Sequence, residues 1–203
     1  MEMFGWANDP QFWLGLLQIV WIDIILSGDN AVVIALACRR LPPSQQRVAI
    51  LAGTGAAIAL RVAMATVVTL LLEISWLKLA GSGLLLWIAI KLLAPQDGEG
   101  GDGASIGSLW QAIRTIVIAD FVMSLDNVIG IAAAAKGSVL LLTLGLMISI
   151  PLIVFSSTLI LKFMGRYPWI VTLGGALLGY IAGEMAVTDR AVAGWIADHA
   201  PVL

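Results

Sequence analysis

Charged residues are scarce in this chain. Asp, Glu, Lys and Arg make up 12% of its 203 residues, whereas 60% are hydrophobic, and the mean hydropathy is +0.99. A soluble domain contains about 25% charged and about 45–50% apolar residues. The composition therefore excludes an ordinary soluble domain and predicts an integral membrane protein surrounded by the lipid bilayer. We expect no nucleic-acid partner.

Soft metal ligands are nearly absent as well. The chain contains one cysteine, Cys38, and one histidine, His199. A single cysteine excludes an intrachain disulfide, and this pair cannot supply the ligands of a zinc centre within one chain. The N-terminus lacks the basic region and the cleavage site of a signal peptide, so we expect the first apolar segment to be retained.

Long apolar runs, by contrast, recur along the chain. We predict six membrane-spanning helices, at residues 12–38, 48–72, 77–93, 109–135, 139–163 and 169–187. The first would extend about 40 Å as one helix, which exceeds the ~30 Å hydrocarbon core, so it is either tilted or broken near Ser27 and Gly28. Between the third and fourth spans, the acidic and glycine-rich residues 95–107 read as a solvated linker.

One motif, D-x-x-x-S-x-D-N, occurs in the middle of the first span and again in the middle of the fourth. The first copy runs from Asp23 to Asn30 and the second from Asp120 to Asn127, at an offset of 97 residues. A weaker similarity relates residues 80–91 to residues 173–184. Residues 1–94 and 108–203 are therefore predicted to be two three-helix repeats. Because three spans is an odd number, the second repeat enters the membrane from the opposite side, which gives an all-α, inverted-repeat fold typical of secondary transporters.

Basic residues are unevenly distributed between the two sets of predicted loops. One set has seven near its span ends, and the other has three. The larger set is Arg39, Arg40, Arg47, Lys91, Arg114, Lys162 and Arg166, and the smaller set is Lys78, Lys136 and Arg190. By the positive-inside rule, the larger set and the linker are cytoplasmic, and both termini lie outside the cytoplasm.

The chemistry of the two motifs indicates a site for a hard cation. On a regular helix Asp23, Ser27 and Asn30 share one face, and Asp29 lies about 120° away. Either each helix stays regular and its two aspartates face different partners, or the helix unwinds and both carboxylates reach one cavity. Carboxylate, amide and hydroxyl oxygens suit Mg²⁺, Ca²⁺ or Mn²⁺. Four carboxylates within the membrane cannot all stay charged without a cation, so we expect metal entry to release protons.

The two motifs, the six spans and the acidic linker resemble the TerC family of integral membrane proteins, in its short bacterial form, over essentially the whole chain. This resemblance implies a multi-pass protein of the bacterial inner membrane that exports metal ions, with Mn²⁺ as the cargo and no permanently bound cofactor. Ca²⁺ and Mg²⁺ stay open on ligand chemistry, and so does a homodimer. The matching positions are Asp23, Asp29, Asn30, Asp120, Asp126 and Asn127, together with Ser27 and Ser124.

Several of these residues have structural alternatives. The asparagines could join helices, and the serines could bond the backbone carbonyl four residues back. Arg61, in the middle of the second span, is either a counter-ion to an aspartate or extends to an interface. Glu184 is either an entrance ligand or a solvated helix end.

Two other functions compete with metal export. An exporter of amino acids or other small solutes would need a larger cavity. An intramembrane aspartyl protease also uses two aspartates on different spans, but acid–base catalysis requires carboxylates in different roles, and the duplicated motif favours coordination. We therefore expect a transporter and not an enzyme.

Overall fold

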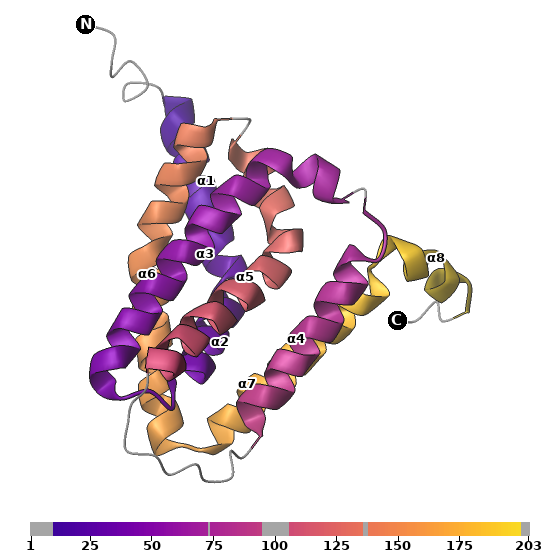
Figure 1. The fold of residues 1–203 in the computed structure, drawn as a ribbon. Helices are drawn as coiled ribbons and strands as arrows, with labels where there is room; N and C mark the ends of the chain where they lie inside the picture. The colour runs from indigo at the N-terminus through magenta and orange to yellow at the C-terminus, as the bar shows by residue number, and fades with distance from the viewer. Residues whose placement is uncertain (1–9, 73, 95–105, 136–137, 200–203) are drawn as a thin grey trace, which may run out of the picture.

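The computed structural model describes residues 10–72, 74–94, 106–135 and 138–199, and every regular element in these ranges is an α-helix (Figure 1). This confirms the all-α class for the described part of the chain. The helices are α1 (Pro10–Leu26), α2 (Gly28–Cys38), α3 (Pro43–Leu72), α4 (Leu77–Leu93), α5 (Ile106–Ala135), α6 (Val139–Arg166), α7 (Trp169–Val187) and α8 (Arg190–His199).

Three of the described helices are long and apolar enough to cross a membrane, namely Pro43–Ala65 of α3, α6 and α7. The bent pair α1 and α2 forms a fourth candidate if it is counted as one span. Two predicted spans, 77–93 and 169–187, coincide with α4 and α7.

The helices extend beyond the predicted spans at two places. Helix α5 begins at Ile106, inside the linker predicted at 95–107, and the rest of that linker lies outside the described residues. Residues 190–199, which lie beyond the last predicted span, form the additional helix α8. The Thr188–Asp189 pair before it is the N-cap signal that could have indicated it.

The first motif lies at a helix break. Helix α1 ends at Leu26, α2 begins at Gly28, and the two axes differ by 51°. The sequence left open a tilted helix or a broken one, and the structure has a broken helix at this point. Glycine has a low helix propensity, and Asp29 places a carboxylate in the first turn of α2, where the helix dipole favours negative charge. The second motif has Leu125 in the position of Gly28, and α5 continues through it.

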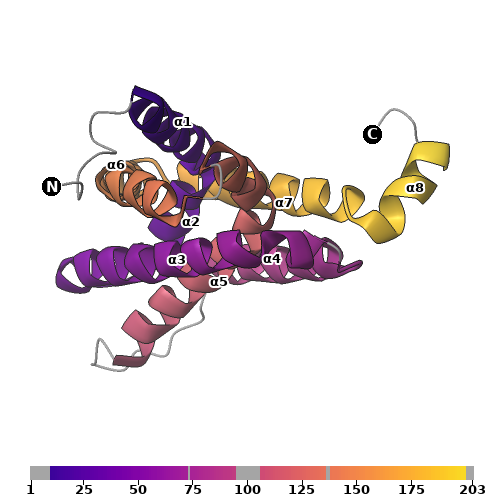
Figure 2. The same cartoon turned by 90° about the horizontal axis from the view of Figure 1, so that it is seen from above.

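The helices form two unequal groups (Figures 1 and 2). Helix α3 packs on α5, and α1 packs on α6, in the larger group. Helices α4 and α7 contact each other much more extensively than either contacts any other helix, and they run side by side at one edge of the molecule. Helix α8 projects from the end of this pair (Figure 2).

Two close helix contacts are related by the sequence repeat. Ile19 of α1 packs on Gly145 of α6, where an added Cβ would lie 2.4 Å from the isoleucine Cγ2. Ile116 of α5 packs on Gly53 of α3 in the same manner, with its Cδ1 at 2.8 Å from an added Cβ. Ile19 and Ile116 are separated by the 97 residues that separate the two motifs. The two isoleucines at matching sequence positions therefore each pack on a glycine of another helix, which allows a close helix approach.

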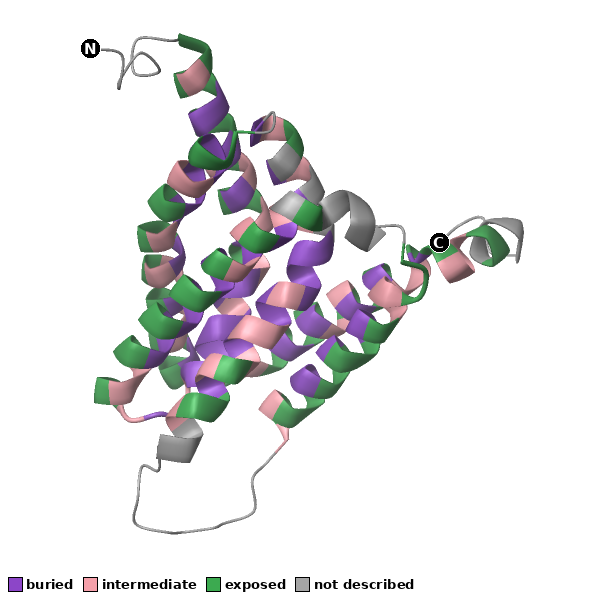
Figure 3. Ribbon diagram, turned by 45° about the horizontal axis from the view of Figure 1, so that its top comes forward, coloured by how far each residue is buried: buried purple, intermediate pink, exposed green. Residues whose placement is uncertain are grey.

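Apolar side chains cover both the interior and the outer faces of the helices. Buried residues line the inner faces, and exposed residues lie along the outer faces (Figure 3). Large hydrophobic residues on the outside include Leu17, Trp21, Phe155 and Tyr180, each more than 60% exposed. Such a surface would be unstable in water but suits contact with lipid chains.

Asp189 connects the start of α4 to the start of α8. Its side chain is 1% exposed and accepts hydrogen bonds from the backbone N–H of Trp76 at 3.1 Å, of Leu79 at 3.0 Å and of Ala191 at 2.7 Å. One carboxylate thus caps the N-termini of both α4 and α8. Burial acts to raise the pKa of Asp189, but these N–H donors outweigh it and hold the pKa below its ordinary value.

We predict that Asp189→Ala lowers the free energy of unfolding by about 2 kcal/mol, at about 1 kcal/mol for each helix cap. Because the pKa of Asp189 falls on folding, its stabilisation is complete above the unfolded value of 3.8 and is lost as the pH falls through the folded pKa. Thermal unfolding in detergent should therefore show a Tm gap between the wild type and Asp189→Asn at pH 7 that narrows below about pH 4. Equal Tm values at pH 7 for wild type and Asp189→Ala would contradict the double cap.

Candidate functional site

One guanidinium group occupies the centre of the polar interior. Arg61 of α3 is 2% exposed. Its Nη1 forms an ion pair with Asp23 Oδ1 of α1, and its Nη2 donates to Asp120 Oδ1 of α5 at 2.6 Å. Of the two possibilities for Arg61, the structure therefore has the pairing with aspartates, one from each motif copy. These contacts connect three helices at one point.

The motif serines complete two equivalent units around this arginine. Ser27 Oγ donates to Asp23 Oδ1 at 3.1 Å, and Ser124 Oγ donates to Asp120 Oδ2 at 3.2 Å. Each hydroxyl also accepts from Arg61, which donates through Nη1 to Ser27 at 3.3 Å and through Nε to Ser124 at 3.0 Å. Each serine thus donates to the carboxylate four residues back. The alternative of a bond to the backbone carbonyl of that residue is not what the structure has.

The two motif asparagines have different surroundings. Asn127 Nδ2 donates at 3.1 Å to the carbonyl of Leu26, the last residue of α1 before the break. The break removes the helical partner of that carbonyl, and Asn127 replaces it. Asn30, its counterpart, is 3% exposed, and neither polar atom of its amide group has a hydrogen-bond partner. Helix α5 is continuous through the second motif, so it offers Asn30 no equivalent free carbonyl.

The remaining predicted residues lie at the edge of this network or outside it. Asp29 is half-buried, and its Oδ1 accepts from the N–H of Asn30 at 2.8 Å. Glu184 is exposed near the end of α7 and makes none of the hydrogen bonds or ion pairs of the Arg61 network. Asp126 lies within α5, but its side chain is outside the described part of the structure.

The structure adds Thr54, which sequence analysis did not identify. Thr54 lies two helical turns before Arg61 on α3 and is 2% exposed, and its hydroxyl has no partner. Thr54, Asn30, Arg61 and Asp120 line one cavity of about 10 Å³, which is close to the space needed by one water molecule. The seven-residue spacing between Thr54 and Arg61 in an otherwise apolar segment is the signal that could have indicated this residue.

The charges of this region do not cancel. Among the side chains of this region that the structure describes, the three carboxylates of Asp23, Asp29 and Asp120 and the one guanidinium of Arg61 give a net charge of −2 when all are ionised. Asp23 Oδ2 is buried without a hydrogen-bond partner. Among the residues that the structure describes, no three His, Cys, Asp or Glu side chains are grouped closely enough to hold a metal ion. Asp23 and Asp120 instead bind separate nitrogens of Arg61.

Comparison with known proteins finds relatives among membrane proteins. The profile of the family described as "Integral membrane protein TerC family" matches residues 8–202. The chain is 43% identical to the uncharacterized membrane protein YjbE of Bacillus subtilis, over 96% of this chain and 88% of YjbE. It is 27% identical to the uncharacterized membrane protein YceF of the same organism, over 88% of this chain and 73% of YceF.

A longer relative is the UPF0053 inner membrane protein YoaE of Escherichia coli. The identity is 28% over 81% of this chain, which spans 35% of the length of YoaE. No solved structure gives a significant match.

We predict that Arg61→Met destabilises the protein by about 3–5 kcal/mol, because it leaves Asp23 and Asp120 buried without a counter-charge. The triple variant Asp23→Asn, Arg61→Met, Asp120→Asn removes all three charges and should recover most of the lost stability. Thermal unfolding of the purified proteins in detergent measures both effects. A triple variant no more stable than Arg61→Met would show that the charge pairing is not what stabilises this region.

Proposed function

The chain belongs to the TerC family of integral membrane proteins, and on this basis we propose that it is a secondary transporter of the bacterial inner membrane that exports a divalent metal cation, with Mn²⁺ as the cargo. The observation that carries the proposal is the convergence of Asp23 and Asp120, one from each motif copy, on a single buried point. Carboxylates within a membrane are costly and mark ion pathways.

The donor atoms and the available space both favour a small, hard ion. Asp120, Asn30 and Thr54 present oxygen atoms around the small cavity, and oxygen donors suit Mn²⁺, Mg²⁺ and Ca²⁺. A cavity of about 10 Å³ is too small for an amino acid, so it argues against the small-solute exporter in this conformation. An aspartyl protease needs its two carboxylates to share a water, whereas here Arg61 binds both. We accordingly propose that the protein is not an enzyme.

The packing supports a six-span inverted repeat. We assign α1 with α2, α3 and α4 to the first repeat and α5, α6 and α7 to the second. In an inverted repeat, a contact between the first and fifth spans has its counterpart between the fourth and second spans. The first pair is α1 and α6, the second pair is α5 and α3, and both pairs are in extensive contact. The contacts of Ile19 with Gly145 and of Ile116 with Gly53 fulfil the same requirement at residue level. The positive-inside rule would place both termini outside the cytoplasm.

We propose that the cargo and Arg61 compete for the same carboxylates. A divalent cation bound by Asp23 and Asp120 would release the guanidinium, and departure of the cation would let the ion pairs form again. The net charge of −2 matches one divalent cation, and two protons would balance the same charge in its place. Proton-for-metal exchange follows from this charge balance. Asp29, Asp126, Asn127 and the motif serines are further candidate ligands.

The direct test is Mn²⁺ flux into proteoliposomes that contain a Mn²⁺-quenched dye. We expect Asp23→Asn and Asp120→Asn each to lower the initial rate by about tenfold or more. Glu184→Gln makes the same chemical change on an exposed residue outside the network and should leave the rate unchanged. A pH-sensitive dye in the same vesicles should report proton movement opposite to that of Mn²⁺.

Normal flux in Asp120→Asn protein that folds and reconstitutes as the wild type does would contradict the site. Absence of Mn²⁺ flux under any gradient, in protein that binds no divalent cation, would contradict metal transport itself. Competition by Mg²⁺ and Ca²⁺ in the same assay decides the selectivity among hard cations.

Thr54 provides a finer test of where the cargo binds. Thr54→Val keeps the shape of the side chain but removes the hydroxyl oxygen, so we expect the KM for Mn²⁺ to rise by about five- to tenfold. Thr54→Ser retains the hydroxyl and should stay close to the wild type. A change in Tm without a change in KM in Thr54→Val would assign Thr54 to packing alone.

A further inference from the structure

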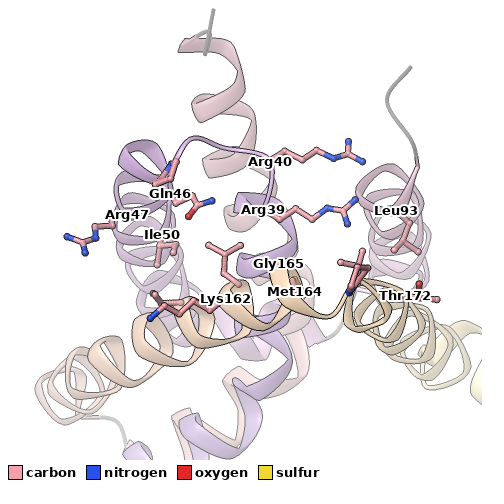
Figure 4. Close-up of a pocket in the computed structure, with 15 residues that line it drawn as sticks. Arg39, Arg40, Gln46, Arg47, Ile50, Leu93, Lys162, Met164, Gly165 and Thr172 are labelled. Carbon is pink, nitrogen blue, oxygen red and sulfur yellow. The ribbon is translucent and has the colours of Figure 1, made fainter. Parts of the chain in front are cut away.

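Two large pockets open at the end of the bundle where α4 and α6 end and α3 and α7 begin. The first has a volume of about 860 Å³, and residues of α3, α4, α6 and α7 line it (Figure 4). The second has a volume of about 740 Å³ and lies between α2, α4 and α5. Arg40 lines both pockets. Both therefore lie along the seam between the α4–α7 pair and the larger group of helices.

The described lining of these pockets carries positive charge and no carboxylate. The first contains Arg39, Arg40, Arg47 and Lys162, and the second contains Arg40, Lys91 and Arg114. Such a lining repels a divalent cation, so neither pocket suits the proposed cargo. It attracts an anion, and guanidinium groups match the geometry of a phosphate group.

Two of these arginines are held in place. Arg39 Nη2 donates to the carbonyl of Leu92 at 2.9 Å, and Arg40 Nη2 donates to the carbonyl of Ala94 at 2.6 Å. Figure 4 shows both side chains extended toward the end of α4 at Leu93, with Arg47 and Lys162 extended to the opposite side. A guanidinium has five N–H donors, so one bond to a carbonyl fixes its position and leaves donors for a phosphate.

The second pocket continues from this basic rim into an apolar groove. Its walls include five aliphatic side chains and two tryptophans, namely Leu36, Leu84, Ile88, Leu92, Ile118, Trp87 and Trp110. Trp87 and Trp110 are 56% and 65% exposed, as expected of residues at the level of lipid headgroups. Lys91 Nζ lies 5.0 Å from the centre of the Trp87 ring. A rim of cations above an apolar groove fits a headgroup above an acyl chain.

We propose that this seam binds an anionic phospholipid, with its phosphate at Arg39 and Arg40 and an acyl chain in the groove between α4 and α5. The bound lipid would connect the α4–α7 pair to the larger group of helices. This proposal does not depend on what the protein transports, since none of the residues in the Arg61 network lines either pocket.

Native mass spectrometry of the purified protein, titrated with phosphatidylglycerol or phosphatidylcholine of identical acyl chains, tests the proposal. Phosphatidylglycerol should bind at least about tenfold more tightly than phosphatidylcholine. Arg39→Gln with Arg40→Gln should weaken phosphatidylglycerol binding about twenty-five-fold, given about a fivefold loss for each cation removed. Lys78→Gln with Arg190→Gln removes two cations from the opposite end of α4 and from α8, and should change nothing.

A second variant is needed because Arg39 and Arg40 also bond the end of α4. Lys91→Gln with Arg114→Gln removes two rim cations from the second pocket and should lower the affinity for phosphatidylglycerol by a similar factor. Equal affinity for the two lipids, or wild-type affinity in both double variants, would overturn the proposal.

The source of the phosphate is tested with soluble glycerophosphoglycerol, which has the headgroup but no acyl chains. We expect it to displace phosphatidylglycerol only at concentrations at least about a hundredfold higher, because it cannot use the groove. Leu84→Trp fills part of the groove. It should lower the affinity for the lipid and leave the affinity for the soluble headgroup unchanged. Displacement at equal concentrations, or an unchanged lipid affinity in Leu84→Trp, would assign the rim to a free phosphate compound and overturn the lipid assignment.

Discussion

The buried pairing of Arg61 with Asp23 and Asp120 is the constraint on which the interior of this protein depends. A charge within a membrane is costly, and here three charges neutralise one another only in part. The pairing requires α1, α3 and α5 to meet at one point, which in turn brings the two motif copies together. Ser27 and Ser124 bond the same carboxylates and fix their orientation. Removal of any one of these three charges therefore alters the charge balance of the whole site.

The duplicated motif produces two unequal structures. Gly28 permits a break in the first copy, whereas Leu125 keeps α5 continuous in the second. The broken end of α1 exposes the carbonyl of Leu26, which accepts a hydrogen bond from Asn127 of α5. Asn30 lacks such a partner and instead lines the cavity with Thr54. The break thus converts one asparagine into a structural cap and leaves the other available to a ligand.

Charge is segregated along the molecule. Carboxylates gather in the interior around a single arginine, while the pockets at one helix end have only cations among their described charged residues. The interior therefore favours a cation, and the rim favours an anion. The segregation keeps the proposed cation site apart from the proposed lipid-phosphate site. The pockets of about 860 and 740 Å³ accordingly lie away from the motif residues.

Sequence alone determined the membrane class, the helical fold, the ends of α4 and α7 and the residues of the two motifs, because these depend on local apolar runs and on a repeated pattern. It could not decide between a tilt and a break at Ser27, since that choice depends on whether Asn127, about a hundred residues away, caps the freed carbonyl. It left two roles open for Arg61, and the seven-residue spacing of Thr54 from Arg61 was too weak a signal to identify Thr54 by itself. Only the crossing of α1, α3 and α5 placed these side chains beside Asp23, Asp120 and Asn30, because distance in the chain does not determine proximity between helices.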